Sequence, residues 1–117
     1  MNKRQTGTAY EEKAARYLEE KGYQILERNY RCRQGEIDLI ARDGSCLVFV
    51  EVKYRRDDRL GYPAEAVDGR KQLHIQRAAA WYCYTHQIPE WHPCRFDVIS
   101  ITGEETEHII NAFEMQG

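Results

Sequence analysis

The sequence has no long hydrophobic run, and this absence excludes a membrane-spanning helix. Its longest relevant apolar stretch, Leu47 to Val50, is far shorter than the roughly 18–20 residues that a helix needs to cross a bilayer. No apolar segment follows the charged residues at the amino terminus, so a secretory signal is not expected either. These absences predict a cytoplasmic protein without a membrane partner.

The sequence also lacks paired cysteines. Its four cysteines form no CxxC pair, and without an export signal they are expected to remain reduced thiols. Cys83, His86, His92 and Cys94 lie within twelve positions, but their spacing matches no common zinc module. A zinc site at these residues is therefore not favoured.

No repeat, linker or low-complexity stretch divides the chain, so its 117 residues predict a single domain over 1–117. Hydrophobic residues make up 42% and charged residues 31%, a composition typical of a soluble globular domain. The net charge of -2 gives no overall sign of nucleic-acid binding. Residues 28–77 hold eleven basic and eight acidic side chains, an excess that an ordinary charged surface would also explain.

Hydrophobic periodicity and turn residues predict the order αβββαββ, with the first three strands forming an antiparallel meander. Thr8 is expected to cap the first helix, with Glu11 completing a capping box, and Gly22 to end it. Asp68 is expected to cap the second helix. The predicted helices span residues 7–22 and 68–86, and the predicted strands span residues 24–31, 36–42, 45–53, 95–101 and 107–112. This order favours an α/β fold with a central mixed sheet flanked by helices.

The third predicted strand is apolar on both faces until its last residues. The valines at positions 48, 50 and 52 share one face, while Leu47 and Phe49 begin the other. That second face then changes to Glu51 and Lys53, two charges that are expensive to bury without partners. The sequence therefore predicts compensating groups near the end of this strand.

The preceding hairpin supplies a second carboxylate. A two-residue turn of Asp43 and Gly44 would pair Asp38 with Phe49, which sets Asp38 on the face of Glu51, roughly 7–8 Å away between α-carbons. Mg²⁺ and similar cations bind one or two carboxylates together with water and phosphate oxygens. Lys53 would then contact a scissile phosphate or the attacking water. The alternative is a Glu51–Lys53 surface pair, which burial of the strand on both faces makes less favourable.

Two segments carry a resemblance to a known group of enzymes. The sequences GEIDLI at residues 35–40 and VFVEVK at residues 48–53 resemble the D…ExK core of the PD-(D/E)xK nuclease superfamily. More closely, nearly the entire chain resembles the bacterial YraN-like family, which is similar to archaeal Holliday-junction resolvases and restriction endonucleases. The further matching motifs are Gly7-x3-Glu11-x2-Ala14, Gly22-Tyr23, Asn29-Tyr30-Arg31 and Arg95-Phe96-Asp97-Val98.

This resemblance implies a restriction-endonuclease-like fold and phosphodiester hydrolysis that depends on Mg²⁺ or Mn²⁺. By position, Asp38 and Glu51 become metal ligands, Lys53 the catalytic lysine, and Glu11 a further acidic residue of the catalytic site. The capping box remains the alternative role for Glu11. The usual PD pair is Ile37-Asp38 in this chain, which retains the acidic position.

The implied partner is nucleic acid, with DNA favoured and branched or structured DNA as a candidate substrate. The basic residues predicted to contact phosphates are Arg31, Arg55, Arg56 and Lys71, although each could equally be an ordinary surface cation. A non-catalytic nucleic-acid-binding module and an RNA-directed nuclease remain the alternatives, and a homodimer stays open.

Aromatic residues are the last candidates for contact with nucleic acid. Tyr54 follows Lys53 and could stack on an unpaired base, or it could simply pack at the end of its strand. Trp81, Tyr82 and Tyr84 lie together on the second helix and are predicted to belong to the core.

Overall fold

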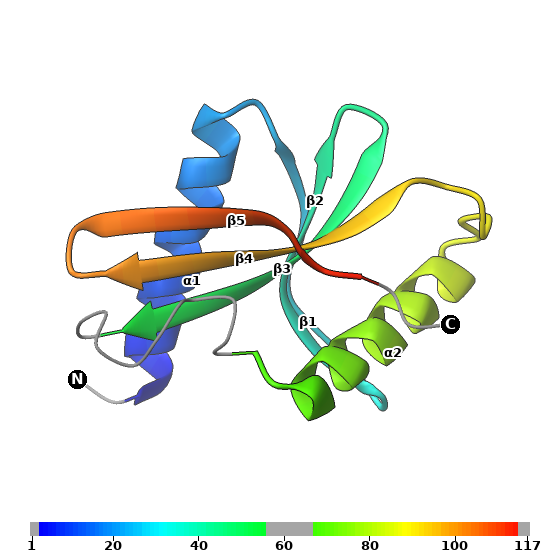
Figure 1. Ribbon diagram of the computed structural model, residues 1–117, viewed down its shortest axis with the longest axis horizontal. Helices are drawn as coiled ribbons and strands as arrows, with labels where there is room; N and C mark the ends of the chain where they lie inside the picture. Colours follow the sequence, from blue (N-terminus) through cyan, green and yellow to red (C-terminus); the bar gives the residue numbers. More distant parts are fainter. Residues whose placement is uncertain (1–2, 56–66, 115–117) are drawn as a thin grey trace.

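The computed structural model of the protein describes residues 3–55 and 67–114. Within these ranges the elements follow the predicted order αβββαββ (Figure 1). The helices are α1 (Lys3–Glu20) and α2 (Gly69–Thr85), and the strands are β1 (Gln24–Cys32), β2 (Gly35–Asp43), β3 (Cys46–Arg55), β4 (Cys94–Thr102) and β5 (Glu105–Phe113). Neither helix is both long and apolar enough to cross a membrane over the residues described.

The strands form one mixed sheet in the order β1-β2-β3-β4-β5. The predicted antiparallel meander of β1, β2 and β3 is confirmed. Strand β4 runs parallel to β3, and β5 returns antiparallel to β4. A parallel pair needs a long crossover connection, and α2 lies in the connection between β3 and β4 (Figure 1). Strand β3 is therefore the central strand of the sheet.

The two helices cover opposite faces of this sheet. Leu47 and Phe49 of β3 pack in a cluster with α2 residues, whereas Val48 and Val50 pack in a cluster with α1 residues. Consecutive side chains of a strand point to opposite faces, so these clusters lie on the two sides of the sheet. The prediction that β3 is buried on both faces is confirmed, since all four side chains are at most 3% exposed.

The predicted ends of the helices are partly confirmed. Gly22 follows α1 with φ of +93°, and the Tyr23 N–H donates to the Leu18 carbonyl at 3.0 Å, which is a glycine-ended helix terminus. Asp68 caps α2 by accepting a hydrogen bond from the Lys71 N–H at 2.9 Å. The capping box at Thr8 is wrong, because α1 begins at Lys3 and Thr8 lies inside the helix.

The predicted hairpin register is also wrong, by one position in the turn. Gly44, with φ of +61°, takes the first central position of the β2–β3 turn, the position that glycine takes in type II′ turns. Asp43 consequently pairs with Cys46, and Arg42 with Leu47 rather than with Ser45. The shift alters which residues of β2 lie opposite the charged end of β3.

The aromatic segment of α2 is split between the core and the surface. Tyr82 is 5% exposed, whereas Trp81 is 41% and Tyr84 is 75% exposed, so the prediction of a core position is wrong for these two. Helix α2 buries Ile75, Ala78, Ala79 and Tyr82, which recur at three- and four-residue spacing. Trp81 and Tyr84 fall outside that stripe.

Candidate functional site

Asp38 and Glu51 meet where the ladder between β2 and β3 ends. The paired residues run from Asp43 and Cys46 to Leu39 and Val50. One further step in this register sets Asp38 directly opposite Glu51, not diagonally from it as the predicted register would. Asp38 Oδ2 accepts a hydrogen bond from the Val52 N–H at 2.8 Å. Just beyond the last paired residues, a side-chain oxygen is thus the acceptor for a backbone N–H of β3.

Glu51 is close enough to Asp38 to shift the pKa of Asp38. Glu51 is 5% exposed. Burial, followed by the nearby Glu51, raises the pKa of Asp38 to about 8, while the Val52 N–H and Lys71 oppose the rise. Two like charges in a poorly solvated site cannot both ionise freely without a cation. Burial and the neighbouring Glu51 therefore both favour the neutral form of Asp38.

Two lysines reach the same oxygen of Glu51 from different elements. Lys53, on the same strand, has its Nζ 3.4 Å from Glu51 Oε1, and Lys71, from the first turn of α2, has its Nζ 2.6 Å from that oxygen. Burial and then Lys71 lower the pKa of Lys53. Burial also acts to lower the pKa of Lys71, but its hydrogen bonds to Glu51 and Lys53 raise the pKa overall. The compensation that the sequence required thus comes from both lysines.

The ion pair between Lys71 and Glu51 is not predicted by the sequence. The sequence predicts that Lys71 contacts phosphate and gives no sign of a contact with Glu51, and the structure adds the shorter of the two ion pairs of Glu51. The available signal was its position in the first turn of the helix that follows β3. A position along the chain, however, does not reveal which strand a helix side chain will reach.

Glu11 lies near the carboxylate pair but does not complete a metal cluster with it. Burial raises the pKa of Glu11, a hydrogen bond with the Asn29 side chain lowers it, and Glu36 and Glu51 raise it further. Glu11 also contributes to the raised pKa of Asp38. Over residues 3–55 and 67–114, no three His, Cys, Asp or Glu side chains are grouped so that they could share a metal ion. That finding applies equally to the cluster from Cys83 to Cys94, whose cysteines are free.

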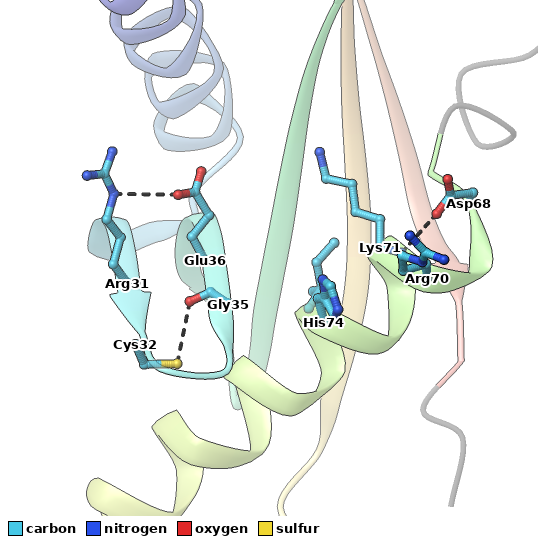
Figure 2. A pocket seen from close by; sticks show the side chains of 9 residues that line it. Arg31, Cys32, Gly35, Glu36, Asp68, Arg70, Lys71 and His74 are labelled. Carbon is cyan, nitrogen blue, oxygen red and sulfur yellow. Dashed lines mark hydrogen bonds and ion pairs between the residues drawn. The ribbon is translucent and has the colours of Figure 1, made fainter.

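A cleft of about 550 Å³ adjoins the site, between the β1–β2 hairpin and the start of α2 (Figure 2). Arg31 and Glu36 line the hairpin side, where they form an exposed pair at 3.5 Å, and Arg70, Lys71 and His74 line the helix side. The two walls come close at Gly35, where an added Cβ would lie 3.2 Å from the His74 carbonyl oxygen. The full lining is Arg31, Cys32, Gly35, Glu36, Asp68, Arg70, Lys71, His74 and Ile75.

The predicted phosphate-contacting residues are thus only partly brought together. Arg31 and Lys71 share the cleft, and Arg70 joins them there. The side chain of Arg55 and all of Arg56 lie outside the described part of the structure. Tyr54 is 46% exposed, and its ring stacks on Tyr10 with the ring centroids 4.1 Å apart, so packing accounts for one face of that ring.

A second buried acid, Asp97, lies on the opposite face of the sheet. Its carboxylate, 0% exposed, accepts hydrogen bonds from the Arg95 guanidinium at 3.0 Å and the Asn111 N–H at 2.9 Å, and it contacts His108 Nε2 at 2.7 Å. Burial acts to raise the pKa of Asp97, but its hydrogen bonds with His108, Arg95 and Asn111 lower it overall. Sequence reasoning recorded Asp97 only within a motif, although an aspartate in an apolar strand predicts a buried network.

Fold and site together define an α/β protein in which buried Glu51 and partly buried Asp38 meet two lysines at the central strand of a mixed sheet. The model of uncharacterised protein family UPF0102 matches residues 10–101, and the chain belongs to that family, which is the YraN family of the resemblance. The matched range contains Asp38, Glu51 and both lysines.

Relatives in several bacteria match over nearly the full length. A UPF0102 protein of Lachnoclostridium phytofermentans is 51% identical over 117 residues, which cover 100% of this chain and 99% of the relative. A UPF0102 protein of Syntrophus aciditrophicus is 49% identical over 114 residues, covering 94% and 89%. A UPF0102 protein of Moorella thermoacetica is 41% identical over 117 residues, covering 100% and 97%.

Proposed function

We propose that the protein is a metal-dependent endonuclease that hydrolyses phosphodiester bonds in DNA, with branched or structured DNA as the candidate substrate. The observation that carries this proposal is the meeting of Asp38 and Glu51 at the end of the β2–β3 ladder. The order of Asp38, Glu51 and Lys53 along the chain, which resembles the D…ExK nuclease core, supports it. In this proposal the protein acts in the cytoplasm.

The donor set fits Mg²⁺ or Mn²⁺. Both cations accept carboxylate oxygens, and Mg²⁺ in particular binds to one or two carboxylates while it keeps several waters. A bound cation would favour the charged form of Asp38, which burial and Glu51 oppose in the protein without metal. When bound, the metal would lower the pKa of a coordinated water and stabilise charge on the phosphate.

Lys53 is proposed as the catalytic lysine. It follows Glu51 by two residues on β3, so its side chain lies on the same face, and its Nζ is 3.4 Å from Glu51 Oε1. From this position an ammonium can bind a phosphate oxygen or orient the attacking water beside the carboxylates. Arg31 and Lys71 would hold the phosphates on either side of the adjoining cleft. Arg55 and Arg56 stay proposed as further phosphate contacts on the sequence alone.

The decisive experiment is a cleavage assay with purified protein and labelled duplex, single-stranded, flap, four-way-junction and RNA substrates, in Mg²⁺, Mn²⁺ or EDTA. We expect metal-dependent cleavage of DNA, which Asp38→Asn, Glu51→Gln and Lys53→Ala each abolish. Glu19→Gln, an exposed glutamate near the end of α1, is the matched control for Glu51→Gln and should cleave like wild type.

Two other outcomes would replace this proposal. Cleavage of RNA alone would identify an RNA-directed nuclease. Tight binding of DNA without cleavage of any substrate would favour a non-catalytic binding module, in which the lysines simply neutralise Glu51. The same preparations show whether the active species is a homodimer, an arrangement that would let two strands of a junction be cut together.

A further inference from the structure

Lys71 connects the carboxylate pair with the adjoining cleft. Its Nζ lies 2.6 Å from Glu51 Oε1, and its side chain also lines the cleft together with Arg31 and Arg70 (Figure 2). The side chain is 43% exposed, whereas that of Lys53, the other partner of Glu51, is 24% exposed. Lys71 therefore has a buried partner on one side and an open cleft on the other.

We propose that Lys71 is a displaceable counter-ion of the metal site. In the metal-free protein it neutralises Glu51, a divalent cation then displaces it, and the released ammonium binds a nucleic-acid phosphate in the cleft. This inference rests on the proposed function and adds to it a mechanism that couples metal binding to substrate binding. The coupling is reciprocal, because a phosphate that holds Lys71 in the cleft also leaves Glu51 free for the metal.

Competition follows from the contact itself. Lys71 and Lys53 both approach Oε1 of Glu51, so a cation that binds this oxygen meets two ammonium groups beside it. Charges of the same sign repel strongly in a partly desolvated site. Metal binding at this oxygen is therefore favoured when one ammonium moves away.

Lys71 is the one that can leave. A lysine side chain is a flexible stem with a strongly hydrated end, and this one adjoins a cleft of about 550 Å³. Its backbone need not move, because the Lys71 N–H is held by the Asp68 carboxylate at 2.9 Å. Lys53 is less exposed and follows Glu51 on the same strand, so it stays beside the carboxylate.

Calorimetric titration with Mg²⁺ and Mn²⁺ tests the competition directly. We expect Lys71→Gln to bind either metal about tenfold more tightly than wild type, which corresponds to about 1.4 kcal/mol. Arg70→Gln is the control, because it removes the same charge from the same helical turn and the same cleft. Equal affinity of Lys71→Gln and wild type would overturn the proposal, and so would an equal gain in the Arg70 variant.

DNA binding with Ca²⁺ or EDTA tests the coupling. Wild type should bind a four-way junction more tightly with Ca²⁺ than with EDTA, and Lys71→Gln should lose most of this gain. A gain that persists unchanged in Lys71→Gln would show that the released ammonium does not bind phosphate, and would overturn that part of the proposal.

The outcomes separate this inference from the proposed nuclease. Metal competition at Lys71 without cleavage of any substrate would support the inference and contradict the nuclease. Absence of metal binding in both wild type and Lys71→Gln would overturn both. If Lys71→Gln does not fold, Lys71→Arg replaces it: a guanidinium grips a carboxylate with two donors, so metal affinity should fall below that of wild type. An unchanged affinity in Lys71→Arg would overturn the competition.

Discussion

The pKa values of two aspartates, one on each face of the sheet, shift in opposite directions. On the α1 face, both oxygens of Asp97 have partners, through Arg95, His108 and the Asn111 N–H, and the pKa of Asp97 is lowered. On the α2 face, Asp38 accepts a hydrogen bond from the Val52 N–H, lies opposite Glu51, and has its pKa raised to about 8. Hydrogen bonds hold Asp97 in its charged form, whereas burial and a second carboxylate favour the neutral form of Asp38.

The largest expected loss of stability follows substitution of Asp97. Asp97→Asn removes the negative charge that faces Arg95 and His108, and breaking a buried charge network costs about 3–5 kcal/mol. Urea unfolding followed by circular dichroism would measure the loss. Asp38→Asn is the control and should lose far less stability, because Asp38 is mostly protonated at neutral pH. Equal losses in the two variants would remove the distinction between the faces.

Metal binding should stabilise the protein through the α2 face alone. A ligand that binds only the folded state at 100 times its dissociation constant adds about 2.7 kcal/mol to the free energy of unfolding. Thermal unfolding with and without Mn²⁺ would detect this gain in wild type. In the variant with both Asp38→Ala and Glu51→Ala the gain should disappear. An equal shift in that variant would mean that the metal binds elsewhere.

The raised pKa of Asp38 predicts an unusual pH dependence in EDTA. The unfolded chain releases the Asp38 proton near pH 4, but the folded protein keeps it to about pH 8, so this group lowers stability as pH rises through that interval. The free energy of unfolding of Asp38→Asn should therefore increase relative to that of wild type as pH rises. The expected increase is more than about 1.4 kcal/mol, the value of one pKa unit. The measurement is the free energy of unfolding of both proteins between about pH 5 and about pH 8. If the two curves run parallel, the raised pKa of Asp38 is contradicted.

The smallest effect on stability is expected at Lys53. Lys53→Ala leaves Lys71 in contact with Glu51 and should change the free energy of unfolding by less than about 1 kcal/mol, the range of a partly exposed ion pair. Metal binding should persist while DNA cleavage is lost. Cleavage at the wild-type rate would reduce Lys53 to a surface partner of Glu51.

Local features of the sequence predicted much of the fold correctly. The element order, the glycine that ends α1, the Asp68 cap and the double-sided burial of β3 were all accessible, because each depends on residues near one another in the chain. The candidate acids were accessible for the same reason. A charged residue at the end of an otherwise buried strand marks a place where burial and charge conflict.

Other features depended on contacts that periodicity does not encode. The position of Gly44 within its turn set the register of β2 against β3 and brought Asp38 opposite Glu51. The exposure of Trp81 and Tyr84 followed from which side of α2 meets the sheet.

The chain by itself determined which residues carry charge into the sheet, since strand alternation assigns each side chain to a face. Only the tertiary structure decided their partners: Lys71 for Glu51 from α2, and His108 for Asp97 from β5. The physical reason is that an ion pair needs its groups within a few ångströms, and residues distant in sequence reach that separation only once the helices and strands have packed.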